Sequence, residues 1–168
     1  MKIFNQVPMY AKPDCKFSFQ DINPQNTYPL SESLIREYKI KQIKLLNNLL
    51  EKYDFNLYDP LAIILRNGEH HYIVPPVLEI HDSKLIVAEG HTRLFIANNK
   101  RVKKIRCVVI EGVGVEPISP PTNWNDIETA PYGVSRDFVP NEGYLKRLRK
   151  IEKYMHMAKW YNIVREFK

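Results

Sequence analysis

Residues 77–111 have the sequence VLEIHDSKLIVAEGHTRLFIANNKRVKKIRCVVIE, and this stretch decides the fold class of the chain. Val77–Ile80 and Leu85–Ala88 are short apolar runs separated by polar residues, a pattern typical of two strands joined by a tight turn. The pattern breaks at Glu89-Gly90, and a helical run follows that ends near residue 99. Ile105–Ile110 is again apolar and β-branched. The stretch therefore predicts strand, turn, strand, helix and strand.

Gly90 marks a direct passage from a strand into a helix. Such a passage leaves backbone N–H groups without intrahelical partners and places the positive end of the helix dipole at one point, where anions bind readily. Thr92 adds a hydroxyl, and the guanidinium of Arg93 can bind two phosphate oxygens. An ordinary helix start, with a capping threonine and a surface arginine, would look the same. The residues alone leave phosphate binding and simple capping both open.

The composition predicts one soluble domain. The chain has 168 residues, of which 44% are hydrophobic and 26% charged, enough for one core and too few for two ordinary domains. The sequence contains no run of 18 apolar residues and no signal-peptide core, so we expect a cytoplasmic protein without a membrane partner. Cys15 and Cys107 predict neither a disulfide framework nor a zinc site. We expect no residues that ligate a metal.

The formal net charge of +6 favours an anionic partner. Nucleic acid, a nucleotide and a phosphorylated metabolite all fit this charge. The positive residues gather in two clusters, one after the predicted central helix and one near the C-terminus: Lys100, Arg101, Lys103 and Lys104, and then Lys146, Arg147, Arg149 and Lys150. Each cluster could be only a solvated face. We take both as candidate nucleic-acid-binding surfaces.

The segments before the central stretch predict a peripheral start and a long helix. Four prolines in residues 1–30 argue against a central strand, so we expect an irregular segment with one short strand around Lys16–Phe19. A long helix should begin near Leu34 and pack its apolar face on the sheet. Leu61–Leu65 should be a further strand of that sheet, and a hairpin should connect it to His70–Val74.

The whole chain should be an α+β protein, a small mixed β-sheet with packed helices and a further C-terminal helix. We expect an irregular segment 1–30, a core 31–118, and a region 119–168 in which a loop and a basic helix from about Glu142 pack on the core. The long segment 123–140 is typical of a loop that lies over a site.

Residues 85–110 resemble the core of the ParB-like and sulfiredoxin superfamily. In that family a strand ending in an acidic residue and glycine precedes a short polar motif with arginine at a helix start, and a strand with V-x-x-I-x-x-V-V spacing follows. The matching positions here are Glu89, Gly90, His91, Thr92 and Arg93. The resemblance covers about residues 34–111 and implies a small mixed domain whose motif binds nucleotide phosphates.

The branches of this family imply different activities. Partition proteins carry G-E-R-R, bind CTP and close on DNA, whereas His91 and Thr92 stand at the two middle positions here. Sulfiredoxins carry a reactive cysteine where this chain has His91, so sulfinic-acid reduction is not expected. A third branch phosphorylates free serine with a motif close to D-G-H-T-R, which residues 89–93 match. The N-terminal His-Glu pair of that branch has no clear counterpart here.

Our leading hypothesis is a nucleotide-binding ParB-like domain that acts as a DNA-associated switch or regulator, with CTP or ATP as ligand and with or without Mg²⁺. One alternative is a small-molecule kinase that uses ATP or ADP, with Glu89, Glu32 or Glu37 as base. Another is an interaction module without a ligand. A nuclease is disfavoured because Glu79, Asp82 and Glu89 are the only acids near the centre. The expected partners are a nucleotide and nucleic acid, and a homodimer stays open.

Overall fold

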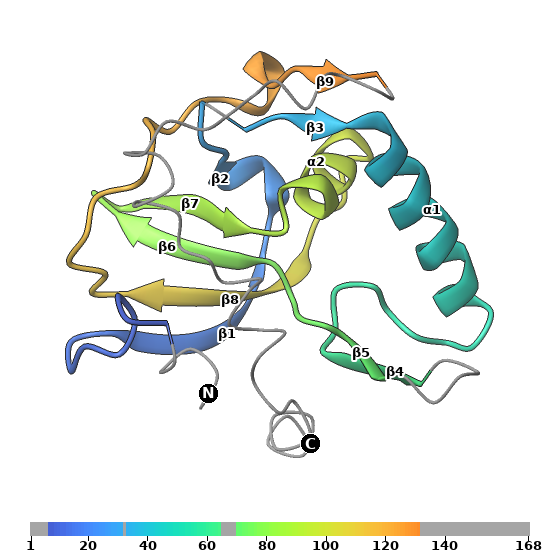
Figure 1. The fold of residues 1–168 in the computed structure, drawn as a ribbon, viewed down its shortest axis with the longest axis horizontal. Coiled ribbons are helices and arrows are strands. Elements are labelled where there is room, and N and C mark those ends of the chain that lie inside the picture. Colours follow the sequence, from blue (N-terminus) through green and yellow to red (C-terminus); the bar gives the residue numbers. More distant parts are fainter. Residues whose placement is uncertain (1–6, 32, 65–69, 132–168) are drawn as a thin grey trace.

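A five-stranded mixed sheet organises the chain, and the computed structural model describes residues 7–31, 33–64 and 70–131. The strands, in their order across the sheet, are β1 (Lys16–Ile22), β8 (Ile105–Glu111), β6 (Val77–His81), β7 (Lys84–Glu89) and β2 (Thr27–Tyr28). Neighbours β1/β8 and β6/β7 are antiparallel, whereas β6/β8 and β2/β7 are parallel. With the helices this sheet confirms the expected α+β class (Figure 1).

The central stretch has the predicted order of elements. Asp82 and Ser83 form the turn between β6 and β7, and both have positive φ, 47° and 63°, as a two-residue hairpin turn requires. Helix α2 (His91–Asn99) follows β7 after one residue, Gly90. The chain then enters β8, which pairs with β6 in parallel. A strand, helix and strand connected in this way keep α2 against one face of the sheet.

Each face of the sheet has its own hydrophobic core. On one face Leu78 of β6 and Val109 of β8 pack with Leu94 of α2 and with Trp124. Trp124 lies in the 3₁₀ turn η3 (Trp124–Asp126), and its Nε1–H donates to Thr27 Oγ1 and the Pro24 carbonyl in the turn η2 (Pro24–Asn26). On the other face Val77, Val108 and Ile110 pack with Val7 and Tyr10.

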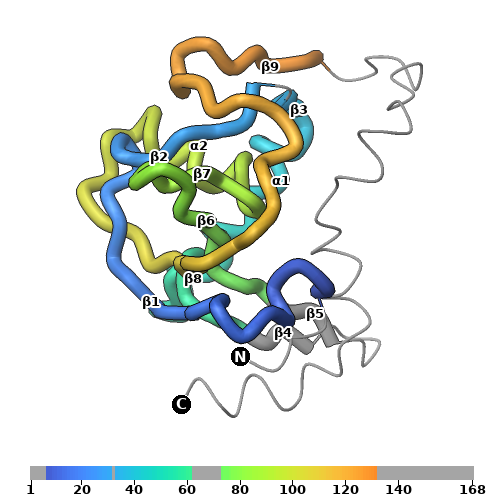
Figure 2. The backbone as a smooth tube through the Cα atoms, turned by 90° about the vertical axis from the view of Figure 1, so that its left-hand side faces the viewer, coloured from blue at the N-terminus to red at the C-terminus, as the bar shows by residue number. Residues whose placement is uncertain are grey.

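Two further pairs of strands lie outside the main sheet. Strand β3 (Ile35–Arg36) pairs in parallel with β9 (Thr129–Ala130). Figure 2 shows how the chain from β8 runs along the side of the molecule to reach β9. Strand β4 (Leu61–Ile64) pairs with β5 (His70–Ile73), which confirms the predicted hairpin, although residues 65–69 lie outside the described ranges.

The prediction that Leu61–Leu65 joins the main sheet is wrong. Strand β4 belongs to a separate two-stranded sheet with β5. The physical reason lies in β6, because β7 and β8 already occupy both of its edges. Pro75-Pro76 separates β5 from β6, and proline has no N–H with which to continue a ladder. The hairpin therefore satisfies its hydrogen bonds locally.

The long helix is also placed differently from the prediction. Helix α1 (Glu37–Glu51) begins three residues after Leu34 and contacts α2 and β3, with Leu50 as its buried residue. Figure 1 shows α2 between α1 and the sheet. The predicted packing of α1 on the sheet is wrong because α2 already covers that face. Leu45 and Leu49 remain exposed in consequence.

The N-terminal strand is longer than expected. Strand β1 spans seven residues, from Lys16 to Ile22, and forms an edge of the sheet. An edge position agrees with the prolines that flank it, Pro13 and Pro24. The helix predicted from Glu142 lies outside the described residues. In the described part of the chain, no helix has the length and apolar character needed to span a membrane.

Candidate functional site

Two features of the structure at position 90 require glycine: the backbone conformation and the lack of space for a Cβ atom. Its φ is 89° and its ψ is 20°, a left-handed conformation that side chains rarely adopt. A Cβ at this position would lie 3.0 Å from the Cα and Cβ of Pro76 and 3.3 Å from Nη2 of Arg93. Its N–H donates to Glu89 Oε1 at 2.9 Å. The turn into α2 therefore depends on this glycine, whatever ligand approaches it.

The N-terminus of α2 has no side-chain cap. The cap position is Gly90 itself, and the first helical hydrogen bond runs from the Leu94 N–H to the Gly90 carbonyl at 3.0 Å. The N–H groups of His91, Thr92 and Arg93 precede that bond, so the helix supplies them with no acceptor. Thr92 is not the capping residue that the simpler interpretation of the sequence required. The helix start is thus a cluster of donors at the positive end of a dipole.

His91 is the first residue of α2, and its imidazole is largely enclosed. Its Nε2 atom is buried and has no hydrogen-bond partner among the residues that the structure describes. Burial lowers the pKa of His91 to about 4, so the ring is neutral at pH 7. A neutral imidazole can accept or donate at Nε2, depending on its tautomer. A buried polar atom without a partner is uncommon and indicates a site for a water molecule or a ligand.

Arg93 turns back toward the sheet. Its Nη1 donates to the Val74 carbonyl at 2.5 Å, which ties α2 to the segment that leads into β6. Burial lowers the pKa of this guanidinium, while the charge of Glu89 and the neighbouring Tyr58 act in the opposite direction. The side chain has five N–H donors, so the bond to Val74 leaves others for a ligand. Nη2 lies close to Gly90, at the start of the helix.

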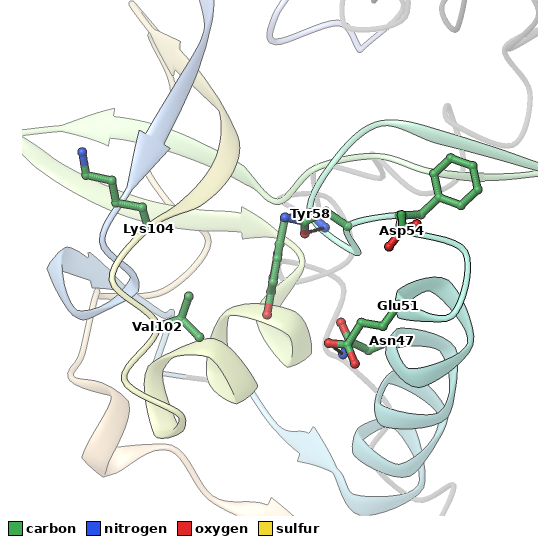
Figure 3. Close-up of a pocket in the computed structure, with 8 residues that line it drawn as sticks. Asn47, Glu51, Asp54, Tyr58, Val102 and Lys104 are labelled. Carbon is green, nitrogen blue, oxygen red and sulfur yellow. Dashed lines mark hydrogen bonds between the residues drawn. The ribbon is translucent and has the colours of Figure 1, made fainter.

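A cavity of about 400 Å³ opens between the end of α1 and the segment after α2 (Figure 3). Its lining comes from α1, from the loop that follows α1 and from the turn before β8: Asn47, Glu51, Asp54, Phe55, Asn56, Tyr58, Val102 and Lys104. Figure 3 shows the Tyr58 ring above α2, with its hydroxyl directed toward that helix. Burial raises the pKa of Tyr58, and the charge of Arg93 opposes this shift. Tyr58 therefore lines the cavity and is also close enough to Arg93, near the start of α2, for their charges to interact.

The predicted basic residues divide between two places. Lys104 lines the cavity, whereas Lys100, Arg101 and Lys103 are exposed at the end of α2 and in the turn after it. This first cluster is accessible to a large anionic partner. The second cluster, Lys146, Arg147, Arg149 and Lys150, lies outside the described residues.

Two of the three acids proposed as bases, Glu89 and Glu37, lie within the described residues. Glu89 uses Oε1 to accept from the Gly90 N–H, and Glu37 is exposed in the first turn of α1. Glu32 lies outside the described ranges. Within residues 7–31, 33–64 and 70–131, no group of three His, Cys, Asp or Glu side chains could hold a metal ion. Glu51 and Asp54, which the sequence did not single out, line the cavity instead.

The sequence analysis also missed a buried polar network. Glu79 is 2% exposed, and its Oε1 accepts from the Tyr10 hydroxyl at 2.5 Å. Its Oε2 lies 2.7 Å from Nε2 of His81. Glu79 and His81 are two residues apart on β6 and therefore point to the same face, which was the available signal. Glu79 is therefore a buried, hydrogen-bonded carboxyl group, unlike the exposed Asp82 in the turn after β6.

Neither thiol is suited to act as a nucleophile. Cys15 and Cys107 are free cysteines. Burial raises the pKa of Cys15, and it raises the pKa of Cys107 to about 12. Both side chains are therefore protonated at neutral pH, when the reactive form would be the thiolate.

Comparisons with known protein families, with curated proteins and with solved structures find no match to this chain.

Proposed function

We propose that this chain is a nucleotide-binding domain of the ParB-like kind that acts as a DNA-associated switch or regulator, with CTP or ATP phosphates at Gly90–Arg93. One observation supports it above the others. The N-terminus of α2 has no side-chain cap, and the buried Nε2 of His91 beside it has no partner in the described part of the chain. Donors without acceptors at the positive end of a helix suit a phosphate group.

The chemistry of the motif fits an anionic ligand. The N–H groups of residues 91–93 and the Thr92 hydroxyl would donate to phosphate oxygens. Arg93 would supply positive charge from a fixed position, because its bond to Val74 already orders the side chain. A side chain that is ordered before binding loses less entropy when the ligand arrives. His91, neutral at pH 7, would add one hydrogen bond at Nε2.

The cavity beside Tyr58 is large enough for the rest of a nucleotide. Its volume of about 400 Å³ falls in the range of small-molecule sites. Tyr58 offers an aromatic surface, and Asn47 and Asn56 offer amide groups that can distinguish ligands by hydrogen bonding. If Mg²⁺ accompanies the phosphates, one or two carboxylates are enough for it, since this ion retains water and binds phosphate oxygens.

A phosphotransferase is the second candidate. Residues 89–93 match the D-G-H-T-R pattern, and the carboxylates of Glu51 and Asp54 line the cavity. A general base has to lie within hydrogen-bond reach of the hydroxyl that it activates. Glu51 and Asp54 are further candidates for that role, beside Glu89, Glu32 and Glu37. Conversion of ATP or ADP in the presence of a hydroxyl-bearing small molecule would separate this activity from binding alone.

Nucleotide binding can be tested by thermal shift and calorimetry with CTP, ATP, ADP and GTP, each with and without Mg²⁺. A specific ligand should raise the melting temperature, since it binds only the folded state. Arg93→Lys should weaken binding about tenfold, because a point charge cannot replace the planar group. Arg93→Lys is a better test than Arg93→Ala, because Arg93 also donates a hydrogen bond to the Val74 carbonyl and alanine would remove that bond together with the charge.

Arg36→Ala is the matched control, since Arg36 is an exposed arginine at the start of the other helix. It should bind nucleotide as the unchanged protein does. Absence of a melting shift with every nucleotide at millimolar concentration would refute the proposal. Equal affinity in Arg93→Lys and the unchanged protein would remove Arg93 from the site.

A further inference from the structure

Helix α1 has an apolar stripe that the other described residues do not cover. Leu45 is 71% exposed and Leu49 is 52% exposed, and a spacing of four residues places them together on one side of the helix. Tyr53, 68% exposed, continues this line one turn further, and Phe55 is 54% exposed in the following loop. We call Leu45, Leu49, Tyr53 and Phe55 the α1 stripe. Exposed apolar side chains that cluster in this way mark an interaction surface.

The packing of α1 explains why the stripe is left exposed. Leu50 is buried, whereas Leu45 and Leu49 are exposed, so they lie on different sides of α1. Figure 1 shows α1 at the outer edge of the molecule, with α2 on its inner side. A helix with apolar residues on two sides has more apolar surface than one neighbour can bury.

The charges beside the stripe are positive. The charged residues three or four positions from Leu45 or Leu49 are Lys41 and Lys52, both exposed. The acids of α1 lie elsewhere, because Glu37 is in its first turn and Glu51 lines the cavity. A partner that covers the leucines would therefore bring its flanking side chains close to two ammonium groups, and acidic side chains fit best there.

Two other occupants fit this charge less well. Antiparallel pairing of α1 with a second copy, with Leu45 opposite Leu49, would bring Lys41 of each copy toward Lys52 of the other. Like charges so placed disfavour association. The C-terminal basic cluster of this chain would add positive charge to the same surface. Both arrangements would bring further lysine or arginine side chains toward Lys41 and Lys52.

We propose that the α1 stripe binds an amphipathic helix of another protein, one in which glutamate or aspartate flanks the apolar residues. The stripe is one row of side chains wide, as an interhelical contact is, with leucines at the spacing at which ridges and grooves of two helices meet. Membrane-surface helices present a broad apolar face, and α1 uses the opposite part of its apolar surface to pack on α2. Leu45, Leu49 and Tyr53 of this surface do not line the cavity proposed for the nucleotide, whereas Phe55 borders both.

The test uses two synthetic helical peptides of about 20 residues and the full chain. One peptide has leucine at heptad spacing with glutamate beside it, and its twin has lysine in place of each glutamate. The acidic peptide should bind, as measured by fluorescence anisotropy, and the basic twin should not. Leu45→Ser/Leu49→Ser should weaken binding about a hundredfold without unfolding the protein, because both leucines are exposed.

Charge reversal gives a sharper measurement. Lys41→Glu/Lys52→Glu should exchange the preference, so that the basic twin binds and the acidic peptide does not. Lys100→Glu/Lys103→Glu is the matched control, with the same change of charge at exposed positions outside α1. It should keep the preference for the acidic peptide.

Three results would overturn the inference. The first is equal binding of the acidic peptide by the unchanged protein and the double-serine variant, or no binding at all. The second is self-association in sedimentation that the double-serine variant abolishes, which would assign the stripe to a second copy. The third is retention on phosphatidylglycerol-containing vesicles that depends on the leucines, with no peptide binding, which would assign it to a lipid surface.

Discussion

At the scale of single residues, the motif combines one glycine that the fold needs with one histidine that the fold leaves unsatisfied. Gly90 is fixed by its backbone conformation and by the closeness of Pro76. The Nε2 of His91 has no partner in the described structure, although burial makes such an atom costly. The first residue serves stability, and the second is the better indicator of a ligand.

Gly90→Ala should lower stability by about 1 to 3 kcal/mol, because alanine resists the left-handed conformation and its Cβ would contact Pro76. Urea unfolding monitored by circular dichroism measures this loss. Gly114→Ala is the matched control, since Gly114 has no positive φ and a Cβ there would meet only the flexible end of Lys12, at 3.2 Å. Equal losses in the two variants would show that the turn at Gly90 tolerates a side chain.

The lowered pKa of His91 should make the free energy of unfolding depend on pH. Its pKa of about 4 lies below the ordinary 6.5, so the unfolded chain binds the proton more readily than the folded one. The contribution of His91 to stability is fully present above pH 6.5 and decreases as the pH falls toward 4. Unfolding experiments at several pH values should show that the free energy of unfolding falls less steeply with decreasing pH in His91→Gln than in the unchanged protein. NMR titration of the ring measures the pKa directly, and an ordinary value would contradict this prediction.

At the scale of elements, local sequence patterns identify the pieces, and competition for space decides where they pack. The order from β6 to β8 could be predicted because each strand and the helix have their own period of apolar residues. The position of β4 could not be predicted, because it depends on which edges of β6 are already occupied by other strands. The packing of α1 was predicted wrongly for the same kind of reason, since α2 lies between α1 and the sheet (Figure 1). The buried network at Glu79 required knowledge that Tyr10 lies opposite.

Two adjacent leucines of α1 test how this helix packs. Leu50→Ala should cost about 2 to 4 kcal/mol, because Leu50 is buried and its removal leaves a cavity. Leu49→Ala, one residue earlier on the exposed side, should change stability by less than about 0.5 kcal/mol. Chemical unfolding of both variants provides the comparison. A larger loss for Leu49→Ala would mean that its side is covered in the folded protein.

At the scale of the whole molecule, the Gly90–Arg93 motif and the first basic cluster lie at opposite ends of α2. The motif is at the start of this helix, and Lys100, Arg101 and Lys103 follow its end. A ligand at one end and a nucleic acid at the other would therefore be connected by one short helix. Such an arrangement is compatible with the proposed switch.

DNA binding, if it uses this cluster, should depend steeply on salt and little on sequence, because the contacts go to phosphates. Lys100→Glu/Lys103→Glu should weaken binding and reduce the slope of log affinity against log salt by about 2. Fluorescence anisotropy with a labelled duplex at several salt concentrations measures both quantities. Lys39→Glu/Lys44→Glu has the same change of charge on α1 and serves as control. A slope unchanged by the first pair would exclude that cluster from the DNA contact.

The pairing of β1 with β8 has a consequence for how the chain folds as it is synthesised. Lys16 pairs with Glu111 and Ile22 with Ile105, so the first strand of the sheet acquires its neighbour only after most of the described chain exists. The sequence from β6 to β8, in contrast, can form from contacts between nearby residues. Contacts between distant segments slow folding. The hairpin of β6 and β7 should therefore form early, and β1 should join the sheet edge late, leaving its backbone groups accessible to other chains during synthesis.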